Sequence, residues 1–379
     1  MKKLIYIANA RIPTEKAHGI QIMKMCESFG ELLARRSFGE GGEVELLVPR
    51  RLNPIKQDPF EYYGVRRSFK ITKLPTLDLI TFGLGSFGFF AETITFLISS
   101  AIYLLFRKYD ILYTREWAAG LFFKNIVLEI HSLPTREAPT PIFLLLRIWK
   151  KAKALLVLTS FIKNKLVKFG VPENKILILP DAVDLDQFQI QNSKFEIREK
   201  LDLPQDKKIA VYTGQLFEWK GAGTFIEAAR LLKDIDFCMV GGSMVGELPY
   251  SNLHFVGQKP HSEIPLWLKA ADVLVLPNKK GFKISEEYTS PLKLFEYMAS
   301  GRPIVASDLP SLREILTEKE AVFFKPNDPA DSARAIKEVL SNPQLASEIS
   351  QNALQKVQNH TWQNRAKRAI DFITGRVYN

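Results

Sequence analysis

Short apolar runs alternate along the chain with longer segments whose apolar side chains recur every three or four positions. In the first half, the apolar runs are bounded by polar or turn-forming residues, which is typical of buried strands in a parallel sheet. The strands are expected at residues 3–9, 43–49, 108–116, 124–134, 154–160 and 175–188. Helical spacing follows the first and fifth of these runs, at residues 20–36 and 161–170. Strands that alternate with helices predict an α/β unit.

The same alternation begins again at residue 209. Apolar runs predict strands at residues 209–214, 237–242, 253–258, 270–277 and 303–308, with helices at 224–232, around 264–271, at 291–300 and over 328–357. The polar segment 191–208 separates the two cycles and is expected to be a linker. Since 379 residues exceed one typical core, we expect two doubly wound domains, at residues 1–185 and 186–360.

Residues 279–310 carry the clearest binding signal. Ser290 followed by Pro291 predicts the start of a helix, and Gly301 predicts its end. Because apolar strands precede and follow this unit, the helix should begin at the carboxyl edge of a parallel sheet, where such folds bind ligands. The backbone N–H groups from Ser290 to Lys293 would then face an anion.

Glu296 lies among apolar residues of the same predicted helix. A buried carboxylate needs a partner, and the hydroxyl pair of a ligand would supply one. A surface glutamate on an amphipathic helix is the alternative.

A second anion site is expected after the strand at residues 209–214. Lys220 is followed by Gly221 and Gly223, so a full positive charge stands beside exposed backbone donors just before a helix. The segment lacks the residue order of a P-loop.

The most apolar part of the chain is residues 77–106. Glu92 and the glycines at 83, 85 and 88 argue against a membrane-spanning helix, which needs about 20 uninterrupted apolar residues. We expect buried or interfacial helices here. The basic end at Arg107 and Lys108 fits a helix that dips into an anionic leaflet, and an internal core helix is the alternative.

Charge is distributed unevenly. Residues 1–180 hold 27 Lys and Arg against 15 Asp and Glu, a net of +12, whereas the rest of the chain has a net of −1. This asymmetry favours a polyanionic partner, either an anionic membrane surface or nucleic acid, over a solvated basic surface. Basic motifs interleaved with aromatic residues are absent from the sequence, so nucleic-acid binding is not expected.

Cys26 and Cys238 show no pairing pattern, and the first residues resemble a buried strand more than a signal peptide. Both features predict a cytoplasmic protein.

His131 follows a predicted strand at the ligand-binding edge, where it would contact a ligand or form only structural hydrogen bonds. Gly19, at the start of the first helix, would let a phosphate approach or simply form a turn.

Four ordered blocks now allow a comparison with a known family. The blocks are YTGQLFEWKGAGTFIEAARLL, FVGQKPHSEIPLWLKAADVLVLP, SPLKLFEYMASGRPIVASDLPSLREIL and ILILPDAVDLDQF. Together they resemble the retaining glycosyltransferases of family four, whose GT-B fold has two Rossmann-like domains that face a central cleft. The resemblance implies transfer of a sugar from a nucleoside diphosphate sugar to a glycan or lipid-linked acceptor. It also implies that a final helix, residues 361–379, crosses back to the N-terminal domain.

The resemblance assigns roles to individual residues. Lys220 matches the lysine on the donor diphosphate, Glu296 the glutamate that holds the ribose hydroxyls, and His131 a histidine near the donor sugar. Together with the residues singled out above, these matches give an expected donor site that comprises Gly19, Gly214, Gln215, Lys220, Glu287, Tyr288, Ser290, Pro291, Leu292, Lys293 and Glu296, and expected catalytic residues His131 and Lys220.

Three positions depart from the family pattern. Gln215 replaces the arginine that accompanies the lysine, Tyr288 replaces the first glutamate of the E-x7-E motif, and Asp181 replaces an asparagine. Lys293 is placed to supply the missing charge, and Glu286 or Glu287 to replace the glutamate. The alternative is a protein that binds a nucleotide sugar, or acts as a scaffold, without catalysis.

Asp184 and Asp186 form a D-x-D pattern. The family carries an aspartate at the same place without using it for a metal, and its members resemble metal-independent catalysts. We therefore expect no metal and no cofactor beyond the nucleotide-sugar co-substrate, with lysines and a helix N-terminus stabilising the departing diphosphate.

Overall fold

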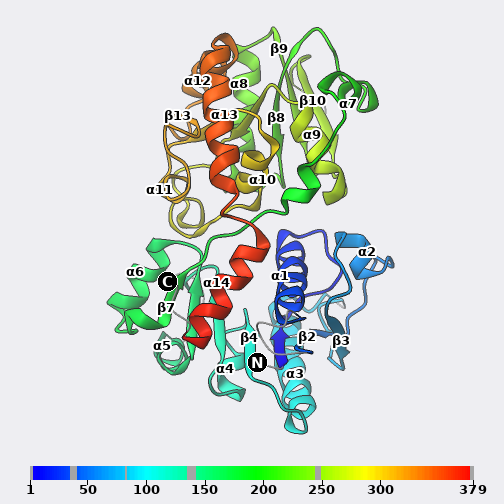
Figure 1. Cartoon of the computed structure of the whole chain (residues 1–379), viewed down its shortest axis with the longest axis vertical. Helices are drawn as coiled ribbons and strands as arrows, with labels where there is room; N and C mark the ends of the chain where they lie inside the picture. Colours follow the sequence, from blue (N-terminus) through cyan, green and yellow to red (C-terminus); the bar gives the residue numbers. More distant parts are fainter. Residues whose placement is uncertain (1–2, 35–40, 82, 135–141, 244–248, 376–379) are drawn as a thin grey trace. The chain divides into compact units, whose positions relative to one another are not determined.

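The structure is a computed structural model that describes residues 3–34, 41–81, 83–134, 142–243 and 249–375. The chain divides into two compact units (Figure 1). The N-terminal unit comprises Met1–Pro180 together with Trp362–Asn379, and the C-terminal unit comprises Asp181–Thr361.

The N-terminal unit is built on a seven-stranded parallel sheet in the order β3-β2-β1-β4-β5-β6-β7. Its strands are β1 (Lys3–Ile7), β2 (Glu43–Pro49), β3 (Lys70–Leu74), β4 (Ile111–Thr114), β5 (Val127–Ile130), β6 (Ala154–Val157) and β7 (Ile176–Ile178). β1 lies inside the sheet between β2 and β4, and Leu4, Ile5 and Tyr6 are completely buried there. The sequence analysis omitted β3, because this edge strand is half exposed and lacks a continuous apolar run.

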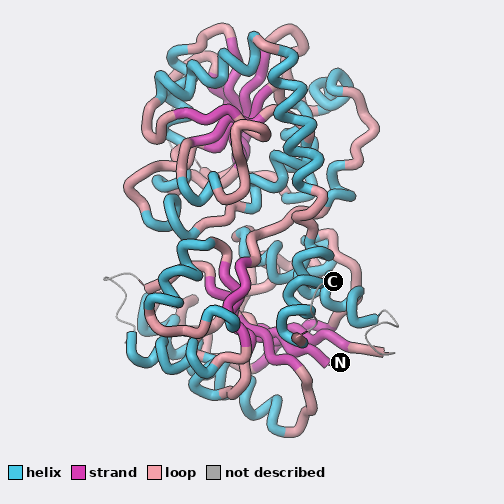
Figure 2. Tube along the Cα trace, turned by 60° about the vertical axis from the view of Figure 1, so that its left-hand side comes forward, coloured by secondary structure: helices cyan, strands magenta, loops and turns pink. Residues whose placement is uncertain are grey.

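Helices enclose this sheet (Figure 2). They are α1 (Ala17–Ala34), α2 (Pro59–Tyr63), α3 (Gly85–Leu105), α4 (Ala119–Phe122), α5 (Ile142–Lys151), α6 (Ser160–Lys168), the short η2 (Glu173–Lys175) and α14 (Trp362–Thr374). α14, from the end of the chain, packs against α1 near the beginning. The N-terminal unit is therefore assembled from both ends of the sequence.

The C-terminal unit has a six-stranded parallel sheet in the order β10-β9-β8-β11-β12-β13. Its strands are β8 (Lys208–Thr213), β9 (Ile235–Val240), β10 (Leu253–Gly257), β11 (Val273–Leu276), β12 (Ile304–Ser307) and β13 (Val322–Phe324). Alternate residues enter different cores: Ile209 and Val211 pack on one face of the sheet, and Ala210 and Tyr212 on the other. Both units are thus Rossmann-like, which confirms the predicted α/β fold.

Helices cover both faces of the second sheet (Figure 2). They are η3 (Leu185–Phe188), α7 (Lys194–Lys200), η4 (Glu218–Lys220), α8 (Ala222–Leu231), η5 (His261–Glu263), α9 (Ile264–Ala270), η6 (Ile284–Tyr288), α10 (Leu292–Ser300), α11 (Pro310–Arg313), α12 (Pro329–Ser341) and α13 (Pro343–Val357). The helical region expected at 328–357 is two helices, because Asn342 caps α13 and Pro343 follows it.

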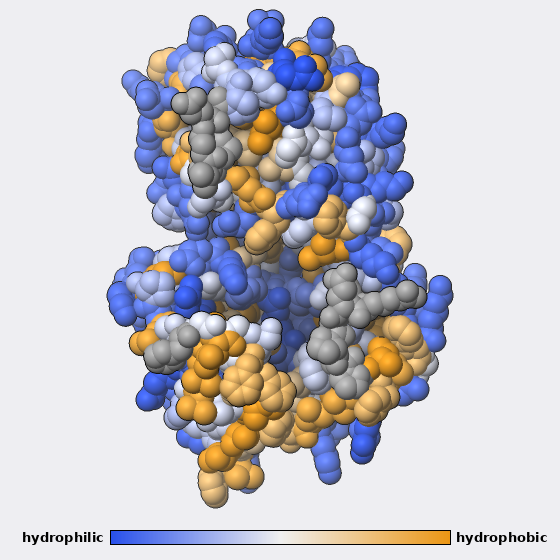
Figure 3. Space-filling model, turned by 180° about the vertical axis from the view of Figure 1, so that it is seen from behind, coloured by the Kyte–Doolittle hydropathy of each residue, from blue (hydrophilic) through white to orange (hydrophobic). Residues whose placement is uncertain are grey.

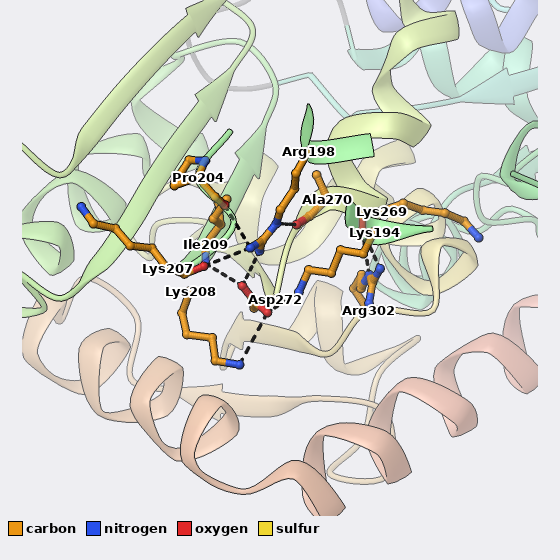
Figure 4. A network of polar contacts seen from close by, with 10 residues as sticks. All are labelled: Lys194, Arg198, Pro204, Lys207, Lys208, Ile209, Lys269, Ala270, Asp272 and Arg302. Atoms are coloured by element: carbon orange, nitrogen blue, oxygen red, sulfur yellow. Dashed lines mark hydrogen bonds and ion pairs between the residues drawn. The ribbon is translucent and has the colours of Figure 1, made fainter. Parts of the chain in front are cut away.

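The segment 191–208 is not the predicted linker. Ser193 and Glu196 form a capping box that begins α7, and the buried Arg198 ties this helix to the sheet (Figure 4). Arg198 Nη2 donates to Asp272 Oδ2 at 2.6 Å, and the backbone N–H of Ile209 donates to the same oxygen at 2.7 Å. Burial alone would raise the pKa of Asp272, but hydrogen bonds from Lys194 and Ile209 and the neighbouring positive charges lower it.

Candidate functional site

The candidate site lies at the carboxyl edge of the C-terminal sheet. β8 and β11 are neighbours there, and the chain continues from β8 toward β9 on one side and from β11 toward β12 on the other. Such a reversal of strand order leaves a crevice beyond the strand ends in doubly wound folds. The loops after these two strands carry the predicted donor-binding residues of this unit.

Hydrogen bonds fix the loop after β8. The Tyr297 hydroxyl, from α10, accepts from the Thr213 N–H at 2.8 Å, and the Tyr212 hydroxyl donates to the Gln215 carbonyl at 3.0 Å. Gly214 has a φ of +131°, and its N–H donates to the Val240 carbonyl at 2.8 Å. Gly214 and Gln215 are therefore held against the ends of β8 and β9.

Gly221 allows this loop to pass close to β11. A Cβ atom at this position would lie 1.7 Å from the Pro277 carbonyl oxygen, and the φ of +74° is one that side-chain-bearing residues rarely adopt. Gly223 has open space around its Cα. Of the two glycines, Gly221 is thus the one that the fold requires.

Lys220 and Lys293 bring two ammonium groups to the same place. Lys220 Nζ lies beside Gly214 and within 5.4 Å of the ring centres of Phe217 and Trp219. Lys293 is 8% exposed, and its Nζ lies 4.2 Å from the centre of the Tyr212 ring. Among the described residues, no hydrogen-bond acceptor contacts this buried Nζ.

Burial lowers the pKa of both lysines. For Lys293 the positive charge of Lys220 lowers the pKa further, and the carboxylate of Glu296 acts in the opposite direction. A buried and a half-buried cation that repel each other are unfavourable without an anion. The pair is therefore suited to a multivalent anion, whose binding would restore the charge on Lys293.

α10 begins later than the sequence predicts. Pro291 occupies the cap position and Leu292 is the first helical residue, with no side-chain cap. The Ser290 hydroxyl accepts instead from the Asp181 N–H at 3.0 Å. Ser290 thus anchors the segment that precedes α10, and the N–H groups of Leu292 and Lys293 belong to the first turn, where an anion is favoured.

Glu296 is 9% exposed on the same helix, so it is not the surface glutamate of the alternative interpretation. Its Oε1 lies 2.6 Å from His261 Nε2 in η5. His261 orients the carboxylate, which occupies the same unit as the two lysines.

The π-helical segment η6 holds the residues considered as replacements for the first glutamate. Tyr288 is 4% exposed, and Glu287 is half-buried. Glu286 Oε1 accepts from the Gly281 N–H at 2.6 Å, which closes the loop before η6. This contact gives Glu286 a structural role.

Asp184 caps η3: its Oδ1 accepts from the Asp186 N–H at 3.2 Å. The described residues contain no group of three or more His, Cys, Asp or Glu side chains that could hold a metal ion.

Two predicted site residues lie in the N-terminal unit. His131, after β5, has Nε2 2.9 Å from Glu129 Oε1, and burial with the nearby Arg115 lowers its pKa to about 4 although Glu129 opposes this. Glu129 also accepts from Arg365 Nη2 at 2.7 Å. Gly19 lies within α1, and a Cβ there would be 2.1 Å from the Tyr63 hydroxyl, so this glycine is needed for packing and not for the predicted turn.

The sequence analysis did not identify three residues of the C-terminal site. These are His261, which contacts Glu296, Tyr212, which lies under Lys293, and Asn278, which follows β11. Asn278 is completely buried, and neither polar atom of its side chain has a hydrogen-bond partner among the described residues. Only the position of Asn278, directly after an apolar strand, is a signal that the sequence offers.

The C-terminal unit is similar to known proteins. Residues 193–356 match the family described as glycosyl transferases group 1. The chain is 23% identical over 315 residues to the D-inositol 3-phosphate glycosyltransferase of Thermomonospora curvata, which covers 70% of the chain and 72% of the relative. It is 26% identical over 229 residues to the processive diacylglycerol alpha-glucosyltransferase of Acholeplasma laidlawii, covering 56% and 65%. The chain spans about half the length of most of the curated relatives that it matches.

Solved structures show the same fold. The crystal structure of Anabaena Alr3699/HepE in complex with UDP-glucose superposes with a TM-score of 0.73 over 99% of this chain and 100% of that chain, at 13% identity. Sucrose-phosphate synthase from Thermosynechococcus elongatus gives a TM-score of 0.77 over 99% of each chain, at 19% identity. The two Rossmann-like units therefore form a GT-B fold, and residues 193–356 are similar to the glycosyl transferases group 1 family.

Proposed function

We propose that this protein is a retaining glycosyltransferase that transfers a hexose from a nucleoside diphosphate sugar to a glycan or lipid-linked acceptor. The observation that carries the proposal is the buried ammonium of Lys293, which has no hydrogen-bond acceptor among the described residues and lies close enough to Lys220 for the two charges to repel. A diphosphate supplies the anionic oxygens that this pair lacks. The relatives and structural neighbours named above support the same class of reaction.

The proposed role of the lysines is to stabilise the leaving group. When the bond from the sugar to the diphosphate breaks, negative charge builds up on the diphosphate oxygens. Lys220, Lys293 and the first-turn N–H groups of α10 offer positive charge fixed before the reaction begins, and such preorganised groups lower the barrier most effectively. Lys293 would thereby replace the arginine whose position Gln215 occupies.

Glu296 is proposed to bind the ribose. Its carboxylate can accept from both ribose hydroxyls, and the contact with His261 fixes its orientation. Two charge-assisted hydrogen bonds to a planar carboxylate are a specific way to hold a diol.

We propose further that catalysis needs no resident metal, because the two lysines supply the charge that a divalent ion would supply. Turnover should then be unchanged after treatment with EDTA, and a loss that added Mg²⁺ or Mn²⁺ restores would contradict this part of the proposal.

A cytoplasmic location is proposed from the two buried free cysteines.

A non-catalytic nucleotide-sugar-binding protein is the second candidate. It is favoured by Tyr288, a buried aromatic residue at the position of the first motif glutamate, and by Gln215 in place of an arginine. Calorimetry would show binding in both cases, whereas release of nucleoside diphosphate in the presence of acceptor occurs only with an enzyme.

The lysine pair can be tested directly. We expect Lys220→Ala and Lys293→Met each to weaken binding of UDP, UDP-glucose and other nucleotide sugars about tenfold to a hundredfold, because a charge-assisted contact is lost. Lys233→Ala is the matched control, since this exposed lysine precedes β9 at the opposite edge of the sheet. Unchanged nucleotide affinity in both site variants would overturn the proposed donor site.

A further inference from the structure

α3 in the N-terminal unit exposes an apolar stripe along its length. Phe87, Phe90, Ile98, Ile102 and Leu105 follow one another at intervals of three, eight, four and three residues, so they share one face of the helix. Their exposed fractions are between 44% and 73%. Large apolar side chains are rarely exposed in such a row on a soluble surface.

The opposite face of α3 packs inward. Gly88, Glu92, Phe96, Ser100 and Leu104 are buried, and α3 contacts β2, β3 and α4. α3 is the one described helix that is long and apolar enough to cross a membrane, but a third of its most apolar window is buried inside the protein. A helix attached to a folded unit along one face cannot be surrounded by lipid, so the stripe is suited to lying along a surface.

The apolar surface extends beyond the stripe. Figure 3 shows apolar side chains gathered over one face of the N-terminal unit. Phe106, directly after α3, is 87% exposed, and Leu121 and Phe122 of the neighbouring α4 are also exposed. The surface is therefore wider than a single helix.

Basic residues border the apolar surface at the C-terminal ends of α3 and α4. Arg107 and Lys108 follow α3, Lys124 follows α4, and all three are exposed. The Arg107 guanidinium lies 3.6 Å from the centre of the Tyr103 ring, which holds this cation at the end of the helix. In the whole of α3 the sole acidic residue is Glu92, on the buried face.

We propose that this face docks on an anionic lipid surface, with α3 in the plane of the membrane and its phenylalanines in the acyl region. The bordering cations fit phosphate headgroups, and the net charge of +12 on residues 1–180 adds longer-range attraction. A second copy of the chain is a poorer occupant, because a symmetric contact through this face would oppose the same cations. The proposal deepens the proposed function, since it places a lipid-linked acceptor beside the protein.

The experiment is sedimentation of the full chain with vesicles of phosphatidylglycerol or of phosphatidylcholine. We expect binding to phosphatidylglycerol vesicles that weakens in high salt, and much weaker binding to phosphatidylcholine. The double variant Phe87→Ser/Phe90→Ser should bind at least about tenfold more weakly, because two apolar side chains no longer enter the acyl region. Phe195→Ser is the matched control, since Phe195 is 59% exposed on α7 of the C-terminal unit.

Three outcomes would overturn the docking proposal: no sedimentation of the unaltered chain, equal sedimentation of the double variant, or an oligomer that forms without lipid and is lost in the double variant. Nucleotide affinity is measured on the same samples. If nucleotide affinity is retained while vesicle binding is absent, the docking proposal fails and the proposed function stands. If vesicle binding is retained while nucleotide binding is absent, the proposed function fails and docking on the anionic surface stands.

Discussion

At the residue scale, the C-terminal site contains two kinds of charged residue, which differ in how strictly they orient a ligand. Lys220 and Lys293 offer positive charge with little directional preference, whereas the Glu296 carboxylate is held by His261 in one orientation. The two kinds of residue should therefore respond differently when the ligand lacks a ribose.

Glu296→Gln tests this division. The variant should bind UDP about tenfold more weakly, because a neutral amide forms weaker hydrogen bonds to the ribose hydroxyls. Its affinity for inorganic pyrophosphate should change much less than its affinity for UDP, because pyrophosphate has no ribose, whereas Lys220→Ala should weaken both ligands. Calorimetry with the two ligands measures this, and Glu348→Gln, on the exposed side of α13, serves as control. An equal loss for pyrophosphate in Glu296→Gln would refute the ribose assignment.

His131 predicts a dependence of stability on pH. Its pKa is about 4 in the folded protein and near 6.5 when unfolded, so between these values the unfolded chain binds the extra proton. The free energy of unfolding must then fall as the pH falls from 6.5 to 4, by on the order of 2 kcal/mol from this residue. Thermal unfolding of His131→Gln should show a shallower loss over this range. The same slope in the variant and the unaltered chain would contradict the expectation.

Lys220 and Lys293 could be predicted because they stand just before or at the start of a helix that follows an apolar strand. Glu296 could be predicted because it is a carboxylate among apolar residues of the same helix as Lys293. His261 and Tyr212 could not, because their contacts depend on how η5 and β8 approach α10, and nothing local to either residue indicates this. The helix cap predicted at Ser290 and the turn predicted at Gly19 were wrong for a related reason, since a hydroxyl or a missing Cβ can serve a distant segment.

At the scale of elements, the loop from β8 to α8 depends on its approach to β11. Gly221→Ala places a methyl group against the Pro277 carbonyl at a φ of +74°, which should destabilise the protein by at least about 2 kcal/mol. Gly223→Ala, two residues further on and open to solvent, should be neutral or stabilise α8 by up to about 1 kcal/mol. Denaturant unfolding of both variants measures the difference in the free energy of unfolding. Similar values for the two variants would show that Gly221 does not lie close to the Pro277 carbonyl in solution.

Buried strands could be predicted because they are continuous apolar runs, and the order of strands and helices then followed from the α/β pattern. The exposed edge strand β3 lacks such a run, and the apolar run of β13 has only three residues. α7 looked like a linker because its residues are mostly polar, although the spacing of Ser193 and Glu196 is a helix-start signal that could have corrected this.

At the scale of the whole molecule, Arg365 ties the end of the chain to the first sheet. Its Nη2 donates to Glu129 Oε1 at 2.7 Å, and both side chains are almost completely buried. Arg365→Met should therefore destabilise the N-terminal unit by about 3–5 kcal/mol, because Glu129 loses its principal counter-charge in a buried position.

Lys367→Met is the control for this change. Lys367 lies two residues further along the same helix, is half exposed and pairs with Asp371, so its loss should cost less than about 1 kcal/mol. Thermal unfolding of the two variants gives the comparison, and a small effect at Arg365 would mean that α14 is held mainly by its apolar face.

The return of α14 to the first unit also determines the order of events during synthesis. The C-terminal unit is one uninterrupted segment and can fold as soon as it leaves the ribosome, whereas the N-terminal unit is completed only after α14 has been translated. Until then α1 lacks its partner helix and Glu129 lacks Arg365. Of the two units, the one that is begun first is therefore the one that is completed last.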